Sequence, residues 1–423
     1  MPSKLKWRTV RRKVSELVPN PNNPRLITPK QMNDLKRSLR KFNLAEIPVI
    51  NTDNHVVAGH QRLLALQLLG RGEERISVRV PNRKLTRQEY NQYLLSSNRI
   101  GGEWDWTKLS EYFDVGDLLT SGFDDTDLAL IFDDATVEDD DFRVEEELKK
   151  IKMTTVKPGD LYQLGLHRIL CADSTDPDSV RRLLGRKKTA AILQDPPFNI
   201  GLNYDKGIGG KGNYGGTVDD TKPDEVYRQF LHDALSNGLS VCTPDAHIFT
   251  YCDQRYVGLL QSLYAKLEIK YQRTCLWIKN NSTPTPNVAF NKQYEPCVYG
   301  IRGKPYLSDR VKNFSEIMNQ EIGTGNRALE DILDMIDIWL VKRVAGDYEH
   351  PTEKPPSLHE KALRRCTKPG DIVLDLFSGS ASLMVSCDQL KRSAYLVERE
   401  PLFVQLALNR YEKISGKKPR KLN

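Results

Sequence analysis

Ile372-Val373-Leu374-Asp375-Leu376-Phe377-Ser378-Gly379-Ser380 is the stretch that decides the fold of this 423-residue chain. Its apolar beginning predicts a short buried strand, and a glycine turn then leads into an apolar helical stretch from Leu383 to Leu390. Such a strand, turn and helix are typical of α/β domains that bind nucleotide cofactors, although a βαβ unit without a ligand has the same pattern. Glu398 closes a second apolar run, Tyr395-Leu396-Val397, at the spacing where an acidic residue in these folds reaches ribose hydroxyls.

The segment Asp195-Pro196-Pro197-Phe198 follows the apolar run Ala190-Ala191-Ile192-Leu193. A buried strand therefore delivers a carboxylate into a loop that two prolines stiffen. The Asp195 carboxylate and the Pro196 carbonyl can both accept hydrogen bonds from one planar amine, and Phe198 offers a ring face for stacking. Asp and Pro are also common turn residues, so an ordinary exit from a strand is the alternative. The acidic residues that end the predicted strands favour a binding site.

From about Val156 to the C-terminus, the order of these segments resembles the β-class DNA amino-methyltransferases that use S-adenosylmethionine. In that family the Asp-Pro-Pro-aromatic loop precedes target recognition and the Asp-x-Phe-x-Gly turn comes last, as it does here. The resemblance implies a Rossmann-like α/β methyltransferase domain with a mostly parallel sheet flanked by helices, and a reaction that needs no metal. It assigns catalysis to Asp195, Pro196, Pro197 and Phe198.

Four further segments carry the resemblance, and two of them, Thr274 to Lys279 and Gln293 to Tyr299, resemble the family's later sheet strands. The run from Leu164 to Ser174 looks like the family's strand preceding the catalytic one, and His350-Pro351-Thr352-Glu353-Lys354-Pro355 looks like its His-Pro-Thr-x-Lys-Pro segment. Ala381 replaces the usual second glycine of the cofactor turn, and we expect its methyl group to weaken cofactor binding at most. The resemblance assigns S-adenosylmethionine binding to Asp173, Ser174, Lys354, Asp375, Phe377, Gly379, Ser380 and Glu398.

The resemblance also implies that a methyl group passes to an exocyclic amine of a base in double-stranded DNA. That base must be flipped out of the stack at a cost of roughly a few kcal/mol, with Phe198 as the receiving platform. Adenine N6 is the predicted target, because Asp before Pro-Pro favours it in the resembling family. Methylation of cytosine N4 on the same scaffold is one alternative. A catalytically inactive DNA-binding or regulatory protein is another, which the intact Asp195, Asp375 and Glu398 disfavour.

Residues 1–100 form a different module that resembles the smaller ParB/sulfiredoxin-like α/β fold. The segments that carry this resemblance are Pro21-Asn22-Asn23-Pro24-Arg25, the helical run Pro29 to Lys41, the strand Ile47 to Ile50, and Val57 to Leu66. Gly59, His60 and Arg62 are candidates for a phosphate or nucleotide site, since a helix N-terminus and a guanidinium both attract phosphate. The Arg-Arg pair of that family is missing, and a DNA-docking or purely structural module is the alternative.

Formal charge separates the modules. Residues 1–100 contain 20 Lys and Arg against 7 Asp and Glu, a balance of +13, whereas residues 101–150 contain 4 against 17, a balance of −13. A basic module facing DNA and a helical, acidic connector are therefore expected, and the rest of the chain carries the formal net charge of +7. The acidic stretch is interpreted as a solvated linker, with docking on a basic surface as the alternative.

The methyltransferase domain is expected over residues 151–423. Its catalytic part is assigned to residues 151–303, target recognition to 304–345 and the cofactor-binding part to 346–423. The glycine-rich residues 201–222 are interpreted either as a lid over the flipped base or as a surface insertion.

Composition sets further bounds. A chain of this length with 39% hydrophobic residues suits about two to three domains with filled cores. No stretch resembles a transmembrane or secretory segment, so a cytoplasmic protein without a membrane partner is expected. The seven cysteines lie mostly in apolar runs and are expected to be reduced core residues. A homodimer, and a role in restriction-modification or elsewhere, are left open.

Overall fold

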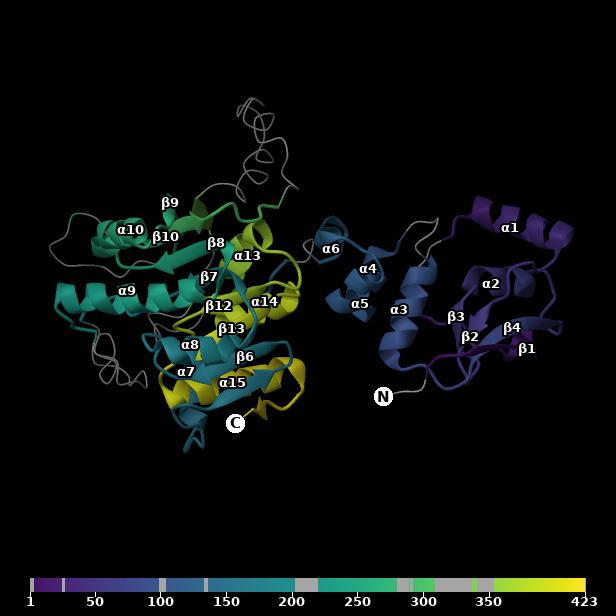
Figure 1. Cartoon of the computed structure of the whole chain (residues 1–423), viewed down its shortest axis with the longest axis horizontal. Helices are drawn as coiled ribbons and strands as arrows, with labels where there is room; N and C mark the ends of the chain where they lie inside the picture. Colours follow the sequence, from purple (N-terminus) through teal and green to yellow (C-terminus); the bar gives the residue numbers. More distant parts are fainter. Residues whose placement is uncertain are drawn as a thin grey trace, which may run out of the picture. The chain divides into compact units, whose positions relative to one another are not determined.

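The computed structural model describes residues 4–24, 27–98, 104–132, 136–201, 220–279, 289, 292–308, 337–340 and 354–422. The chain divides into two compact units, Met1–Asp134 and Ala135–Asn423 (Figure 1). Most of the glycine-rich stretch 201–222, most of the expected target-recognition region 304–345 and the segment 350–353 lie outside the described residues.

One ten-stranded sheet forms the centre of the second unit, in the order β11-β9-β10-β8-β7-β12-β13-β6-β5-β14. Its middle strands all run parallel, and they are β8 (Cys242–Tyr251), β7 (Thr189–Gln194), β12 (Ile372–Asp375), β13 (Ser393–Glu398) and β6 (His167–Cys171). Antiparallel pairings add β5 (Leu161–Leu164) and β14 (Arg420–Lys421) at one side, and β10 (Tyr294–Arg302) and β9 (Lys270–Ile278) at the other. The last strand, β11 (Ile338–Leu340), pairs parallel with β9. The predicted α/β fold is confirmed, with a sheet that is parallel in its middle and mixed at its sides.

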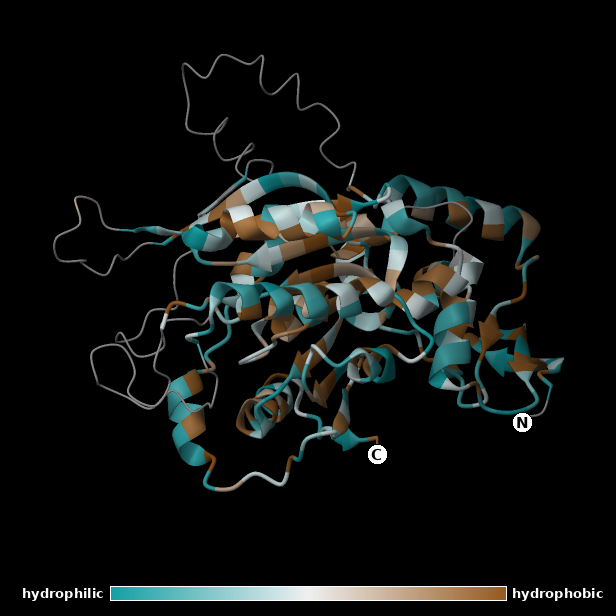
Figure 2. Cartoon of the chain, turned by 60° about the vertical axis from the view of Figure 1, so that its left-hand side comes forward, coloured by the Kyte–Doolittle hydropathy of each residue, from teal (hydrophilic) through white to brown (hydrophobic). Residues whose placement is uncertain are grey.

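Helices cover both faces of this sheet. One face carries α8 (Pro177–Leu184), α9 (Asp224–Ser240) and α10 (Val257–Lys266), with the 3-10 turn η3 (Gln254–Tyr256) before α10. The other carries η4 (Pro356–His359), α13 (Glu360–Cys366), α14 (Ser382–Gln389) and α15 (Pro401–Ser415). In β13, Tyr395 and Val397 pack toward the first set, and Ala394 and Leu396 toward the second. Both faces of this central strand are therefore apolar. Figure 2 shows brown, hydrophobic stretches along the strands of this sheet.

The chain leaves the middle of the sheet in opposite directions from β7 and β12. From β7 it passes through α9 to β8 on one side, and from β12 it passes through α14 to β13 on the other. The two strands are parallel neighbours, with Val373 opposite Ala191 and Leu374 opposite Ile192. Ligands of open α/β sheets bind outside the carboxyl ends of the strands at such a switch point, so the sheet itself marks where a site is expected.

The first unit has a four-stranded sheet in the order β1-β4-β2-β3. Its strands are β1 (Trp7–Lys13), β4 (Arg75–Pro81), β2 (Val49–Ile50) and β3 (Val56–Ala58). Val56 packs in a core with η1 (Val14–Glu16), α1 (Pro29–Phe42) and α2 (His60–Leu68). Val57 packs in the opposite core, with α3 (Arg87–Asn98), α4 (Trp106–Tyr112), α5 (Val115–Thr120) and α6 (Asp125–Phe132).

Residues 101–150, expected from their charge to form a connector, are divided between the two units. The short helices expected there include α4 and α5, and Leu109, Phe113 and Leu118 are buried in the first unit's core. Residues 137–150, including α7 (Val144–Lys150), pack on the second unit. The apolar faces of the short helices α4, α5 and α6 pack in the first unit's core, and a charge count alone did not reveal those faces.

No helix in the described part of the chain is long and apolar enough to cross a membrane.

Leu118 and Leu119 offer a matched test of the first unit's core. Leu118 is fully buried, whereas Leu119 is 46% exposed on the same helix. We expect Leu118→Ala to destabilise the first unit by about 2–5 kcal/mol, because it leaves a cavity that cannot fully collapse. Leu119→Ala should change its stability by less than about 1 kcal/mol. Urea denaturation followed by circular dichroism measures both, and equal effects would contradict the burial of Leu118 in the core that α5 shares with α3.

Candidate functional site

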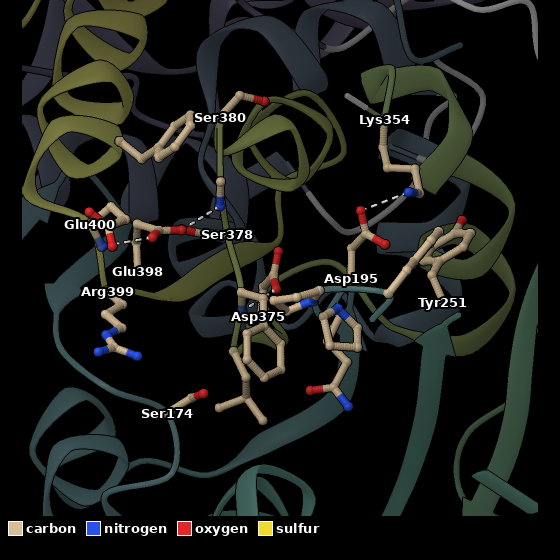
Figure 3. Close-up of a pocket in the computed structure, with 18 of the residues that line it drawn as sticks. Ser174, Asp195, Tyr251, Lys354, Asp375, Ser378, Ser380, Glu398, Arg399 and Glu400 are labelled. Atoms are coloured by element: carbon tan, nitrogen blue, oxygen red, sulfur yellow. Dashed lines mark hydrogen bonds and ion pairs between the residues drawn. The ribbon is translucent and has the colours of Figure 1, made fainter. Parts of the chain in front are cut away.

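A cavity of about 330 Å³ lies at the carboxyl ends of β6, β13, β12 and β7, at the switch point of the sheet. Figure 3 shows its lining, with Asp195, Lys354 and Tyr251 on one side, Glu398, Arg399 and Glu400 on the other, and Asp375 between them. Adjacent parallel strands end at the same edge of a sheet, which is why residues 180 positions apart, Asp195 and Asp375, line one space.

Asp195 is held from one side by a buried ammonium group. Lys354 Nζ donates to Asp195 Oδ2 at 2.7 Å and lies 3.0 Å from Glu295 Oε2. Lys354 is only 5% exposed, and Lys279 pairs with the other oxygen of Glu295. Asp195 Oδ1 is buried and has no hydrogen-bond partner among the described residues. One oxygen of the carboxylate is therefore fixed, and the other keeps its capacity to accept a hydrogen bond.

Burial and mutual attraction set the charges of this cluster. Burial alone would raise the pKa of Glu295, but the Lys354 and Lys279 ammonium groups lower it to about 2. Burial alone would lower the pKa of Lys354, but Asp195 and Glu295 outweigh it, so that this pKa is raised. The pKa of Asp195 is raised by burial and by Glu295, against the opposing effect of Lys354. Glu295 and Lys354 are thus firmly charged, and Asp195 is the group of the three that takes up a proton most readily.

Aromatic rings enclose the same ammonium group. Lys354 Nζ lies 5.1 Å from the ring centre of Phe198, 4.9 Å from that of Tyr251 and 5.7 Å from that of Trp277. Such contacts favour a cation that has lost its water. The Tyr227 hydroxyl donates to the Pro197 carbonyl at 2.7 Å, which fixes the loop between Asp195 and Phe198. The loop that carries the carboxylate and the ring is therefore held from both sides.

Asn199 fastens the chain directly after this loop. Its backbone has a φ of 56°, in the left-handed region that Asn tolerates better than most residues. Its side chain accepts from Lys222 N–H at 2.6 Å and donates to Tyr256 Oη and the Lys222 carbonyl, both at 2.9 Å. The Asp220 carboxylate accepts from the N–H groups of Asn199 and Ile200 at 2.8 and 3.1 Å. Sequence inspection did not identify Asn199 or Asp220.

The opposite wall of the cavity is the turn after β12. Glu398 accepts from Gly379 N–H at 2.8 Å and from Glu400 N–H at 2.9 Å, while Asp375 accepts from Phe377 N–H at 2.9 Å. A Cβ at Gly379 would meet no atom within 4 Å, so the space beside this turn is open. Burial raises the pKa of Glu398 to about 7 and that of Asp375 to about 8. Both carboxyl groups are therefore poised to gain donors from a ligand.

Asp173 and Ser174 follow β6 and complete the far end of the cavity. Asp173 Oδ1 accepts from the N–H and the hydroxyl of Thr175 at 2.9 and 2.7 Å, and its Oδ2 lies 3.8 Å from Arg399. Ser174 is buried, and its carbonyl accepts from Asn237 at 3.0 Å.

The structure brings the predicted site residues of the second unit into one cavity: Asp173, Ser174, Asp195, Pro196, Pro197, Phe198, Lys354, Asp375, Phe377, Gly379, Ser380 and Glu398 all line it. Lys354, assigned to the cofactor by resemblance, contacts Asp195 directly. Glu295 and Tyr251 were not singled out, because their roles follow from pairings between distant strands. The described residues contain no cluster of His, Cys, Asp or Glu able to hold a metal ion, and all seven cysteines are buried.

Gly59, His60 and Arg62 lie in the first unit. Gly59 caps α2 with a φ of 96°, and burial lowers the pKa of His60 to about 4. Arg62 pairs with Glu46. A phosphate at this helix start would therefore compete with Glu46 for the guanidinium group.

Three comparisons show which known proteins this chain is similar to. The N6/N4 DNA methylase family matches residues 189–409, more than half of the chain. The chain is 22% identical to the type II methyltransferase M.HpaI of Haemophilus parainfluenzae over 58% of this chain and 74% of that protein. It is 22% identical to the DNA adenine methyltransferase YhdJ of Escherichia coli (strain K12) over 52% of this chain and 75% of that protein. The structure of TTHA0409 from Thermus thermophilus, complexed with S-adenosyl-L-methionine, is 17% identical with a TM-score of 0.39, over 58% of this chain and 93% of that chain.

The raised pKa of Asp375 predicts that the stability of the fold depends on pH. Its pKa rises from 3.8 to about 8 on folding, so between these values the folded chain holds a proton that the unfolded chain has lost. Raising the pH through this range therefore destabilises the fold, and Asp375→Asn should remove that contribution. The difference in unfolding free energy between variant and wild type, measured in urea without ligand, should grow from about pH 4 to about pH 8. The exposed control Asp178→Asn should show no such growth, and a flat profile for Asp375→Asn would contradict the buried carboxyl.

Proposed function

The chain belongs to the N6/N4 DNA methylase family, and from that premise we propose that it transfers a methyl group from S-adenosylmethionine to N6 of an adenine flipped out of double-stranded DNA. The family establishes a DNA methyltransferase, and the cofactor and the adenine are the finer parts of the proposal. The observation that carries it is the Asp195 carboxylate, fixed through Oδ2 and without a partner on Oδ1 among the described residues, in the cavity that the turn after β12 also lines.

The residues of the cavity fit the cofactor. A carboxylate has about four lone-pair positions, so Glu398 can accept from ribose hydroxyls while it keeps its two backbone donors. The open space beside Gly379 admits a ligand close to the backbone, and Asp173 at the far end can accept a hydrogen bond from the adenine amine of the cofactor. When bound, S-adenosylmethionine supplies a methyl group that its sulfonium already makes electrophilic.

Asp195 then has two tasks. Its Oδ1 and the Pro196 carbonyl accept hydrogen bonds from the target amine, which orients the nitrogen and favours a more tetrahedral geometry. Its negative charge stabilises the positive charge that develops on that nitrogen. Lys354 keeps Asp195 from rotating, and Glu295 and Lys279 balance the buried charges around it. No strong base is required, because the pKa of a methylated aminium group on an aromatic ring is low.

Phe198 lies on the same loop and supplies an apolar face for the flipped base. Base stacking on an aromatic ring contributes about 1–3 kcal/mol, which offsets part of the cost of unstacking. The Lys354 ammonium group lies over this ring, so a base stacked on Phe198 would lie near its positive charge.

The adenine assignment is supported by Asp195 itself and by the name of one relative. Asp before Pro-Pro favours adenine N6 in the family that the sequence resembles, and YhdJ is a DNA adenine methyltransferase. Cytosine N4 is the alternative, since it presents the same amine beside a ring nitrogen.

For the first unit we propose a ParB-like module that adds DNA affinity. Its helix α1 exposes Lys30, Arg37, Arg40 and Lys41 against a single acid, Asp34. When such cations bind DNA phosphates, the counterions condensed on the DNA are released, and this adds affinity without sequence preference. A nucleotide at Gly59, His60 and Arg62, and a homodimer, remain predictions.

Replacing the catalytic carboxylate tests the mechanism. We expect Asp195→Asn to lower turnover by at least about 100-fold, because the amide cannot balance the developing charge, while S-adenosylmethionine affinity changes only a few-fold. Radiolabelled methyl transfer to DNA from a methylation-deficient host measures turnover, and calorimetry measures affinity. Asp178→Asn, at an exposed position, is the control. Substantial activity in Asp195→Asn would overturn this mechanism.

Mass spectrometry of the digested DNA product identifies the base. N6-methyladenine is the expected product, and N4-methylcytosine would replace the adenine assignment while leaving the rest of the mechanism in place.

Removing the first unit tests its proposed role. A fragment of residues 135–423 should keep its cofactor affinity but bind DNA more weakly than the full chain. The slope of log affinity against log salt should become less negative, because fewer phosphates are neutralised. Fluorescence anisotropy with one labelled duplex at several salt concentrations measures both slopes. Equal slopes would show that the first unit does not face DNA.

A further inference from the structure

Residues 137–151, called the strap below, pack along the surface of the second unit and are bonded to it by several of their residues. Val137 N–H donates to Glu360 at 3.0 Å, and Glu138 exchanges two backbone to side-chain hydrogen bonds with Gln389 at 2.8 and 2.9 Å. The Asp139 carboxylate accepts from the N–H and the hydroxyl of Ser357 at 2.8 and 3.1 Å. Three successive residues are therefore fastened to η4, α13 and α14 by specific bonds.

The strap then places a carboxylate on a buried arginine. Arg410 of α15 is 1% exposed, and it donates to both oxygens of Asp140 at 2.5 and 2.8 Å. The Phe142 ring lies 5.0 Å from the guanidinium group. A buried guanidinium needs such a planar, two-bond partner, because the loss of its water is otherwise uncompensated.

The same arginine reaches the cofactor turn. Its Nη1 donates to the Ser380 carbonyl at 2.9 Å and lies 3.2 Å from the Ser380 hydroxyl. Ser380 lines the cavity, as do Val144 of the strap and Phe403 of α15. Phe142 and Val144 pack with Leu406 in a small core beside the cavity. The strap thus contributes directly to one wall of the cavity and indirectly to the position of the turn.

Ala381 shows why the turn needs this support. It has a φ of 60° and a ψ of 36°, the left-handed conformation that is unfavourable for a residue with a Cβ. Its N–H donates to the Ser378 carbonyl at 2.7 Å, so its conformation also sets the direction of the turn. Strained residues persist only where their surroundings over-determine them, and the bond from Arg410 to the preceding carbonyl is such a constraint.

We propose that Asp140 is a positioning residue of the cofactor site: through Arg410 it holds the Ser380 carbonyl and keeps the turn at Ala381 in its binding conformation. Asp140 and Arg410 both lie outside the residues that the family match covers. The inference rests on the proposed function, because the turn is taken to bind S-adenosylmethionine.

Calorimetric titration of the full chain with S-adenosylmethionine tests this proposal. Asp140→Asn should weaken binding on the order of tenfold, the lower end of what loss of a partner behind a metal ligand costs at metal sites. Turnover at saturating cofactor should change much less, so the effect appears in KM. The matched control is Asp141→Asn, because Asp141 is an adjacent, 89% exposed acid that pairs with Lys413. Its affinity should stay within twofold of wild type.

Ala381→Gly provides a second measurement, whose result would not depend on Asp140 if Asp140 only stabilised the fold. Glycine adopts the left-handed conformation without cost, so in the Asp140→Asn background it should recover several-fold of the lost affinity. In the wild-type background, where the turn is already held, its effect should be smaller. An equal effect in both backgrounds would overturn the link between the strap and the turn.

Asp140→Asn takes a carboxylate away from the buried Arg410 guanidinium, so Asp140→Asn with Arg410→Met is the second variant. Removal of both charges is often tolerated by the fold, yet the Ser380 carbonyl still loses its donor. This variant should fold, with an unchanged melting transition, and should bind the cofactor about tenfold more weakly. Wild-type affinity in either variant would overturn the proposal. Failure of the wild-type chain to bind S-adenosylmethionine would instead overturn the proposed function.

Discussion

The adjacency of β7 and β12 in the middle of the sheet is the constraint on which the site depends. Hydrogen bonding between these parallel strands fixes their register, and their connections then leave in opposite directions. The space between those connections cannot be filled by either one. The loop after β7 carries Asp195 and the turn after β12 carries Gly379, so the proposed methyl acceptor and methyl donor meet at one edge of the sheet. Helices pack on both faces of these strands, and the proposed methyl transfer depends on the alignment that this packing supports.

Buried charge is the second theme of the structure. Lys354, Lys279, Asp195 and Glu295 form a cluster with balanced formal charge when all four are ionised, and Arg410 with Asp140 forms a separate pair. Such groups add little net stability compared with apolar residues of the same size, but each is costly to leave without its partner. Their effect is to fix positions: one cluster orients the Asp195 carboxylate, and the other pair contacts the Ser380 carbonyl of the turn that we propose binds the cofactor.

Part of this site could be predicted from the chain alone. Asp195, Asp375 and Glu398 each end or follow an apolar strand, and residues in that position of a parallel sheet lie at one edge whatever the loops do. Glu295 could not be identified in this way. It lies inside β10, an antiparallel strand, and its contact with Lys354 depends on the pairing order β10-β8-β7, which local patterns do not specify. Asp140 was counted as one acid in a charged run, and only the fold shows that its carboxylate pairs with the buried Arg410.

The sequence by itself determined the α/β class, the strand-turn-helix unit around Gly379 and the carboxylate in its proline-stiffened loop. These features are local, since hydrophobic periodicity and the restricted backbone of proline and glycine act over a few residues. The tertiary structure alone decided which oxygen of Asp195 is fixed, that residues 104–132 complete the first unit, and that the acidic strap docks on the second. Those outcomes depend on desolvation, because an aspartate becomes a partner for a buried arginine only when the folded chain has removed both from water.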